Sequence, residues 1–213
     1  MEVQSFTFNF FAENTYVLFD ETKECVIVDP GCYFEEERQA LKKFIAENEL
    51  TPVKLLNTHC HIDHILGNAF VAETYKIDLY CHPKEVEWIE QAPYYGQAMY
   101  NVRVDPSPLP KYFLDEGDTV TFGNTKLDVF FTPGHSVGSI VFYSKADAKA
   151  IVGDVIFHRS IGRTDLPGGN YSHLENSIKT KIYTLPDNTI LYAGHMEPTT
   201  VGEEKRENPF VKG

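Results

Sequence analysis

The sequence is short of positive charge. Its 213 residues include 19 lysines and arginines against 31 aspartates and glutamates, for a formal net charge of -12. A grip on nucleic acid phosphates or on an anionic membrane surface depends on clustered basic side chains. We therefore expect neither nucleic acid nor a membrane as a partner, and polyanionic substrates are disfavoured for the same reason.

Cysteine is scarce, and long apolar runs are absent. The four cysteines, at positions 25, 32, 60 and 81, have no C-x-x-C spacing and are too few for a disulfide scaffold, so we expect reduced, mostly buried thiols. No segment approaches the ~20 apolar residues of a membrane span, and residues 1–8 have neither the basic start nor the apolar stretch of a secretory signal. Both expectations favour a cytoplasmic location.

Strand-like and helix-like segments alternate in the first half of the chain. Alternating or β-branched and aromatic residues predict strands over 6–10, 14–19, 24–29, 53–56 and 78–82, with turns at Glu13-Asn14 and at 20–23. Asp29-Pro30-Gly31 stops the third strand. Apolar residues recur on one face of the charged segment 34–50, which predicts a surface helix lying on a sheet.

The second half repeats this character. We predict strands over 119–122, 125–131, 139–143, 150–152 and 189–193. Ser172 to Glu175 has the pattern of a capping box at the start of a helix over 172–184. No linker separates the halves, so we predict a single α/β domain over residues 1–213. The expected architecture is a four-layered αββα sandwich, with two mixed β-sheets packed face to face and helices on both outer faces.

Residues 91–118 differ from their surroundings. The stretch is rich in proline and tyrosine and has little periodicity. Long irregular loops in compact domains are usually functional or disordered, so the stretch is interpreted as a surface crossover or as a lid. Tyr94, Tyr95 and Tyr100 either line an acyl pocket or pack this crossover.

Four potential metal ligands lie within six positions of an H-x-H-x-D-H motif: His59, His61, Asp63 and His64. Crowded imidazoles and a buried carboxylate are costly unless something pairs with them, and a metal ion resolves both problems. The apolar strand before the motif and the helical residues after it indicate a strand-to-helix turn, where open sheets expose ligand-binding groups. Alternation directs His59 and His61 to the same side and turns Cys60 away into packing.

Three further motifs follow at the ends of later predicted strands. They are Thr132 to Ser139 around His135, Gly153-Asp154 and Gly194-His195. Together with the first motif they resemble the ordered motifs of the metallo-β-lactamase superfamily, over essentially the whole chain. The resemblance implies two metal positions. The first would be held by His59, His61 and His135, the second by Asp63, His64 and His195, with Asp154 bridging.

Imidazole nitrogens and carboxylate oxygens suit Zn²⁺, Fe and Mn²⁺, so we expect two divalent ions, Zn²⁺ foremost. With neutral histidines, two ions less two carboxylates and a bridging hydroxide leave about one positive charge, which fits a developing oxyanion. The expected reaction is attack of a metal-bound hydroxide on an acyl carbon, with Asp63 orienting the water or taking a proton. A thioester is the least demanding substrate, because a thiolate leaves readily.

A narrower resemblance concerns the substrate. Ser160 to Gly169 and residues 200–210 resemble the glyoxalase II-like hydrolases of the short bacterial type. This implies hydrolysis of an S-acylglutathione such as S-lactoylglutathione. Arg163 would bind a carboxylate of glutathione, or would instead form a structural salt bridge with Asp165. We expect no separate C-terminal helical domain for glutathione.

Other activities share this set of residues. Persulfide dioxygenases have a similar Gly-Arg-Thr-Asp segment and use one iron held at the positions of His59, His135 and Asp154. Another small ester, lactone or thioester is also compatible with a metallohydrolase. Metallo-β-lactamases that use two zinc ions usually carry cysteine where Asp154 stands, and a metal-stabilised interaction module would need a closed site. His82, His158 and His173 are interpreted as structural. The sequence does not indicate an oligomeric state.

Overall fold

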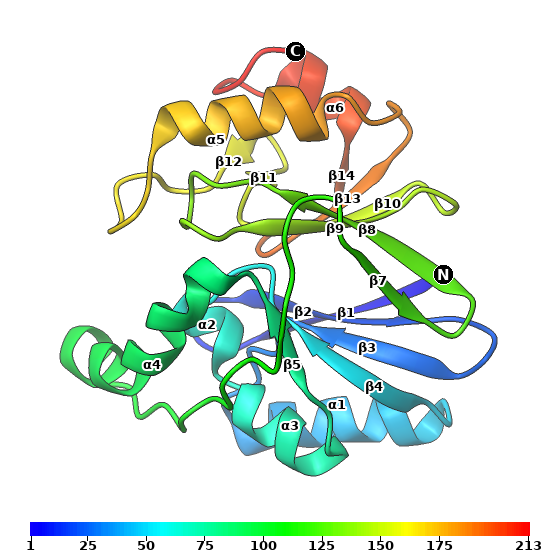
Figure 1. The fold of residues 1–213 in the computed structure, drawn as a ribbon, viewed down its shortest axis with the longest axis vertical. Helices are drawn as coiled ribbons and strands as arrows, with labels where there is room; N and C mark the ends of the chain where they lie inside the picture. The colour runs from blue at the N-terminus through cyan, green and yellow to red at the C-terminus, as the bar shows by residue number, and fades with distance from the viewer. The chain divides into compact units, whose positions relative to one another are not determined.

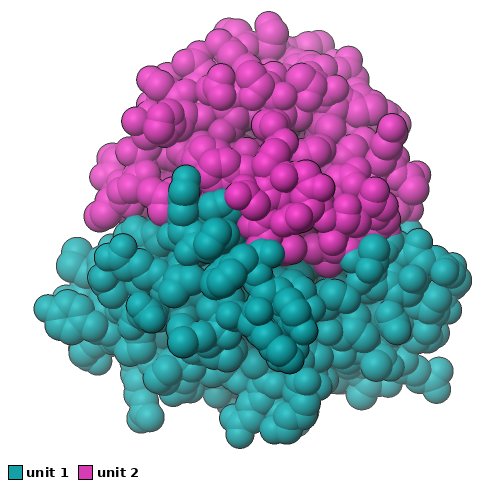
Figure 2. Space-filling model, in the orientation of Figure 1, with its two compact units in different colours: residues 1–113, 121–125 teal, residues 114–120, 126–213 magenta.

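The chain forms two compact units. The computed structural model describes residues 1–213. Unit 1 comprises residues 1–113 and 121–125, and unit 2 comprises residues 114–120 and 126–213 (Figure 2). The expectation of a single domain stays a prediction, and each unit is described by itself.

Unit 1 is built on a six-stranded mixed sheet in the order β1-β2-β3-β4-β5-β6 (Figure 1). The strands are β1 Glu2–Phe8, β2 Glu13–Phe19, β3 Glu24–Val28, β4 Thr51–Leu56, β5 Leu79–Cys81 and β6 Tyr112–Phe113. The first three strands pair antiparallel, whereas β3, β4, β5 and β6 run parallel to one another. The carboxyl ends of four strands therefore meet at one edge of this sheet.

The helices of unit 1 connect and cover these strands. They are α1 Glu35–Glu47, α2 Ile62–Ile65, α3 Asn68–Tyr75, the 3₁₀ turn η1 Pro83–Glu85, α4 Val86–Tyr95 and the π-helical turn η2 Gly96–Tyr100. Leu41 and Ile45 of α1 are buried, which confirms the surface helix expected over 34–50. In Figure 1, α1 and α3 cover the same face of the unit 1 sheet.

Unit 2 contains most of a second mixed sheet, in the order β14-β13-β10-β9-β8-β7. The strands are β7 Thr119–Phe122, β8 Thr125–Phe131, β9 Ile140–Ser144, β10 Lys149–Gly153, β13 Ile190–Ala193 and β14 Thr199–Thr200, with a small hairpin of β11 Ile156–Phe157 and β12 Ser160–Ile161. Strands β10 and β13 are parallel. The helices α5 Tyr171–Ser177, η3 Ile178–Ile182 and α6 Val201–Glu207 complete the unit.

The α/β class, with two mixed sheets and flanking helices, is confirmed, but some local expectations were wrong. Residues 91–100 are helical rather than irregular, because their side chains pack as aromatic pairs that no simple periodicity reveals. The second half's helix begins after Asn170, whose side chain accepts a hydrogen bond from His173 N, so Ser172 is not the N-cap. The first turn covers residues 9–12, and β2 already starts at Glu13.

Each unit has its own apolar core, and the cysteines belong to the first one. All four are free and buried among aliphatic and aromatic side chains of unit 1, as the sequence predicted. Burial raises the pKa of Cys25 and of Cys32 to about 12, so both are inert thiols near neutral pH. None of the helices combines the length and the hydrophobicity that a membrane-spanning helix needs.

A buried carboxylate stabilises one end of unit 1. Asp20, only 5% exposed, accepts hydrogen bonds from Thr22 Oγ1 at 2.5 Å and Thr125 Oγ1 at 2.8 Å, and from the backbone N–H of Asn124 at 2.8 Å. Burial raises the pKa of this carboxyl, but the hydrogen bonds from Thr22, Thr125 and the backbone outweigh it and lower the pKa from 3.8 to about 2. The ionised form is therefore favoured by folding.

We expect the Asp20→Asn variant to show this as a pH-dependent loss of stability. Because the pKa falls on folding, the ionised carboxylate contributes about 2 kcal/mol above pH ~4, and this contribution is lost as the pH falls through about 2. Urea unfolding of both proteins between pH 7 and pH 2 measures the difference. A difference that does not change with pH would contradict this assignment.

Candidate metal centre

The parallel strands of unit 1 place two polar segments side by side. Val28 at the end of β3 pairs with Leu56 at the end of β4. Asp29 directly follows β3, and Asn57 and Thr58 directly follow β4. The carboxyl ends of parallel strands lie at the same edge of a sheet, which is where open α/β structures place their functional groups.

The Asp29 carboxylate connects these segments. Its backbone has a left-handed φ of 48°, which aspartate tolerates better than most residues. Oδ1 accepts a hydrogen bond from Thr58 N at 2.7 Å, and Oδ2 accepts one from Thr58 Oγ1 at 2.5 Å. Oδ2 also lies 3.2 Å from Nδ1 of His64. One buried carboxylate thus holds both ends of the H-x-H-x-D-H motif.

These contacts determine which nitrogen of each histidine can bind a metal. The Thr58 hydroxyl gives its only proton to Asp29, so its oxygen accepts a hydrogen bond from Nδ1 of His59, 3.2 Å away. Nδ1 of His64 donates directly to Asp29. Both rings therefore carry their proton on Nδ1 and present the lone pair of Nε2, the arrangement that outer carboxylates impose on metal-binding histidines.

The four predicted ligands of unit 1 do converge. The ring of His59 lies with its centroid 4.8 Å from that of His61 and 4.1 Å from that of His64. Oδ2 of Asp63 lies 3.7 Å from Nε2 of His64. A carboxylate facing a nitrogen lone pair at this distance is favourable only with a proton or a cation beside them. The donor set of unit 1 therefore fits a metal ion.

Two more buried acids, Glu85 and Glu13, lie beside residues of the motif. Glu85 is fully buried, and its Oε2 accepts a hydrogen bond from Cys60 N at 2.7 Å, while the Cys60 side chain packs into the core as predicted. Glu13 lies with Oε1 4.0 Å from Nδ1 of His64, and Oε2 accepts from Thr15 Oγ1. Burial raises the pKa of Glu13 well above its usual range.

A glycine is required beside these acids. A Cβ on Gly31 would meet the carboxylate of Glu13, the amide of Asn9 and the backbone oxygen of Asp63, all within 2.7 Å. Substitution at this position would displace the backbone that carries Asp63.

Asp29 itself could be mistaken for a ligand. Asp29, His59 and His64 each offer one donor atom within 4.8 Å of the others. Both oxygens of Asp29 are already engaged by Thr58, however, so its carboxylate orients ligands rather than binding a metal ion.

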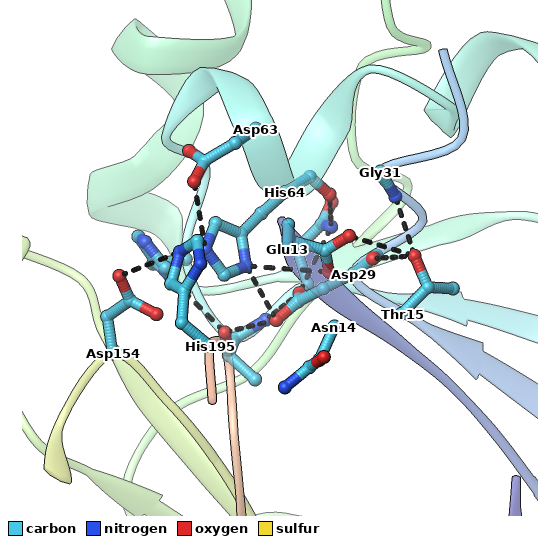
Figure 3. A network of polar contacts seen from close by, with 12 residues as sticks. Glu13, Asn14, Thr15, Asp29, Gly31, Asp63, His64, Asp154 and His195 are labelled. Atoms are coloured by element: carbon cyan, nitrogen blue, oxygen red, sulfur yellow. Dashed lines mark hydrogen bonds and ion pairs between the residues drawn. The ribbon is translucent and has the colours of Figure 1, made fainter. Parts of the chain in front are cut away.

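Unit 2 repeats the principle with its own parallel pair. Gly153 at the end of β10 pairs with Ala193 at the end of β13, so Asp154 and His195 emerge at the same edge. Nε2 of His195 lies 3.6 Å from Oδ2 of Asp154, and Nε2 of His135, which follows β8, lies 3.4 Å from the same oxygen (Figure 3 shows the His195 pair). Two of the three predicted ligands of unit 2, His135 and His195, thus lie beside the carboxylate of the third, Asp154.

The tautomer of His135 is also determined. Its Nδ1 lies 2.9 Å from the backbone oxygen of Arg163, which can only accept, so Nδ1 carries the proton and Nε2 the lone pair. Gly162 is required here, because a Cβ would collide with the backbone oxygen of Asp154. The segment that includes Gly162 and Arg163 therefore orients a ligand through its backbone.

The remaining candidates have structural partners. Nε and Nη2 of Arg163 each donate to Asp165 at 2.9 Å, the salt bridge that the sequence offered as one alternative. His82 accepts from Lys84 N and caps η1. His158 pairs with Glu197 and Glu203, and the hydrogen bond that it donates to the Glu197 carboxylate raises its pKa. His173 donates its backbone N–H to Asn170.

Sequence reasoning missed the supporting acids. Asp29 was interpreted only as a strand stop, and Glu13 as a turn residue. A sequence signal for Asp29 does exist. It is a polar residue directly after a strand that is expected to lie parallel to the strand before the ligand motif. Glu13 and Glu85 offer no comparable signal, because their positions depend on how distant segments pack.

Comparison with known proteins agrees with this geometry. The family model for the metallo-beta-lactamase superfamily matches residues 9–195, which include all seven predicted ligands. The chain belongs to this superfamily. It is 39% identical over 201 residues to a probable metallo-hydrolase of Bacillus subtilis (strain 168), covering 94% of this chain and 92% of that protein.

Further relatives cover nearly the whole chain. The hydroxyacylglutathione hydrolase GloC of Haemophilus influenzae is 32% identical over 212 residues, 99% of this chain and 98% of that protein. Among solved structures, the BLEG-1 B3 metallo-beta-lactamase has a TM-score of 0.92 with 37% identity over 100% of both chains. TTHA1623, solved in a di-iron-bound form, has a TM-score of 0.88 with 34% identity over 98% of this chain and 100% of that one.

We expect removal of the Asp29 side chain to weaken metal binding. The Asp29→Ala variant loses the group that fixes Thr58 and the tautomer of His64, so the affinity for zinc should fall about 10–100-fold. Leaving the Thr58 N–H and the ring of His64 without this acceptor should also lower the free energy of unfolding by about 2 kcal/mol or more. Competition against a chelator of known affinity measures the first effect.

Two variants of Thr58 distinguish the loss of His59 orientation from a general loss of stability. Thr58→Ser keeps the hydroxyl and should bind zinc like the wild type, whereas the isosteric Thr58→Val removes it and should bind about tenfold more weakly. Equal affinities for the two variants would contradict the proposed control of the His59 tautomer.

Proposed function

We propose that this protein is a dinuclear metal hydrolase that cleaves a thioester, an S-acylglutathione such as S-lactoylglutathione. The observation that carries the proposal is the set of histidines whose Nδ1 atoms are held by neighbouring acceptors: His59, His64 and His135. Nε2 of His64 and of His135 then faces a carboxylate, one in each unit. The full-length similarity to a hydroxyacylglutathione hydrolase supports the choice of substrate. The reduced, buried thiols fit the proposed cytoplasmic location.

The proposed ligands divide between two ions. His59, His61 and His135 would hold one, Asp63, His64 and His195 the other, and Asp154 would bridge them. Neutral imidazole and carboxylate suit zinc best among common ions, with iron or manganese as alternatives. When bound, the ions supply Lewis acidity to the substrate carbonyl and lower the pKa of a water molecule.

The side chains then have distinct tasks. Asp63 has one carboxylate oxygen beside His64, and its other oxygen is proposed to accept a hydrogen bond from the attacking water and so to orient it. Asp29 and Thr58 keep the imidazoles in the tautomer that ligation needs. The thiolate leaves without a protein acid, because a thiol has a pKa near ~8.5.

Two alternatives are retained for the test. A persulfide dioxygenase would use a single iron at His59, His135 and Asp154, and a metallohydrolase could act on another small ester, lactone or thioester. Because the chain is similar to the BLEG-1 B3 metallo-beta-lactamase, a β-lactam is included among the substrates to be tested.

We expect purified protein to contain close to two metal ions per chain and to release thiol from S-lactoylglutathione. The measurement combines elemental analysis with a thiol-reactive dye for S-lactoylglutathione and acetyl-CoA, and it follows a homoserine lactone by acid release and nitrocefin by its colour change. A single iron per chain with oxygen uptake on glutathione persulfide would overturn the hydrolase proposal.

Asp154 provides the internal control for this experiment. Asp154→Ala should lose both metal and thioesterase activity, because the bridging carboxylate is gone. Asp128→Ala, which alters a half-buried aspartate paired with Lys126, should keep both. Full activity in Asp154→Ala would contradict the two-metal arrangement.

Arg163 is proposed to bind a carboxylate of glutathione once it leaves Asp165. If so, Arg163→Ala should raise KM about tenfold and change kcat little, because a ground-state contact is lost. Asp165→Ala is the matched control, since it breaks the same salt bridge but keeps the guanidinium, and it should leave KM unchanged or lower it. Equal effects of the two variants would return Arg163 to a purely structural role.

A further inference from the structure

Unit 1 carries a continuous series of aromatic rings that starts at a proposed metal ligand. The ring of Trp88 on α4 lies edge-to-face with that of His61, with centroids 5.1 Å apart. Tyr95 follows at 6.0 Å from Trp88, and Tyr100 at 5.7 Å from Tyr95. Helix α4 packs against α2, which begins directly after His61, so these rings are held beside the ligand motif.

The series continues on the loop between β1 and β2. The ring of Phe11 lies 5.2 Å from that of Tyr100, and Phe10 lies 4.6 Å from Phe11. Phe34, at the start of α1, contacts Phe10 edge-to-face at 6.4 Å. We call these six side chains the aromatic row: Phe10, Phe11, Phe34, Trp88, Tyr95 and Tyr100.

Hydrogen bonds of Glu37 and Asn9 hold the segments that carry part of the row. Glu37 accepts hydrogen bonds from the backbone N–H groups of Asn9, Tyr33 and Phe34, at 2.6, 2.8 and 3.0 Å. The side chain of Asn9, whose backbone has a φ of 51°, donates to the backbone oxygen of Asp63 at 3.1 Å. The loop that carries Phe10 and Phe11 is thereby tied to the backbone of a proposed ligand.

Much of this aromatic surface is exposed. Phe10 is 49% exposed, Phe34 46% and Tyr100 40%. Contiguous exposed apolar surface of this kind marks binding sites more often than scattered apolar residues do. Rings held in fixed positions offer contact area at little cost in conformational entropy.

The acidic side chains on the helices that carry the row disfavour a negatively charged ligand group. The elements that carry the rings also carry exposed acids: Glu35 and Glu36 on α1, and Glu87 and Glu90 on α4. The nearby cation Arg38 is paired with Asp105 at 3.6 Å. An uncharged ligand group is therefore favoured here.

We propose that the aromatic row is the acyl-binding subsite, and that the preferred substrate is a thioester with an uncharged aryl acyl group rather than a small hydroxyacyl group. This inference rests on the proposed thioesterase function. The acyl group is attached to the reacting carbon, so it is the part of the substrate that must lie next to the ligand His61, where the row begins. Aromatic pairs add affinity beyond the apolar area that they bury.

Trp88 makes the test direct, because it is the chain's single tryptophan. The probes are S-(2-phenylethyl)glutathione and S-ethylglutathione, thioethers that lack the carbonyl and are not hydrolysed, added to the metal-loaded full chain. We expect the aryl probe to change Trp88 fluorescence and to bind about tenfold more tightly than the ethyl probe. Equal affinities would overturn the proposal.

Variants of the exposed rings test whether the preference for the aryl probe depends on the aromatic row. Phe10→Ala and Phe34→Ala remove exposed rings, so the fold should survive, and each should reduce the preference for the aryl probe several-fold. Phe113→Ala removes an exposed phenylalanine of β6 outside the row and should leave the preference unchanged. A preference that persists in the double variant Phe10→Ala/Phe34→Ala would overturn the assignment.

Hydrolysis separates this inference from the function on which it rests. S-phenylacetylglutathione should have a kcat/KM about tenfold above that of S-lactoylglutathione, and the Phe10→Ala variant should narrow the gap. Turnover of both thioesters at equal kcat/KM would leave the thioesterase function standing and overturn the aryl subsite. Aryl-probe binding that is sensitive to Phe10, without turnover of any thioester, would support the subsite and overturn the thioesterase function.

Discussion

The Asp29 carboxylate is the contact on which the ligand motif depends. It lies at the end of one strand and reaches the backbone and hydroxyl of Thr58 at the end of the parallel neighbour, and the ring of His64 beyond it. Without this acceptor, His59 and His64 could adopt either tautomer, and the backbone N–H of Thr58 would lose its hydrogen bond. A single carboxylate thus turns a run of polar residues into an ordered set of metal-directed nitrogens.

Both units use the same device. In unit 1, β3 and β4 run parallel and bring Asp29 to Thr58, and in unit 2, β10 and β13 run parallel and bring Asp154 to His195. Each parallel pair lines up the carboxyl ends of its strands, so polar groups distant in sequence become neighbours without long polar loops. The positions of these polar groups therefore depend on strand direction as much as on residue type.

The sequence predicted the longer strands and the main helices, because periodicity is a local signal. Close spacing singled out His59, His61, Asp63 and His64, whereas His135, Asp154 and His195 became ligand candidates only through the resemblance to the metallo-β-lactamase superfamily. The sequence missed the helical turn through Tyr100 and the row of rings, since contacts such as Phe11 with Tyr100 join residues far apart in the chain. It also missed Glu13 and Glu85, whose roles arise from packing. For Arg163 it offered two roles, and the salt bridge to Asp165 is the one present in the structure.

The most direct measurement of the central claim is anomalous diffraction at the zinc edge from crystals of the zinc-loaded protein. The account predicts two anomalous peaks per chain, one bonded to Nε2 of His59 and the other to Nε2 of His64, with Asp154 touching both and Asp29 touching neither. A single peak, or bonding through Nδ1 of His59 or His64, would contradict it.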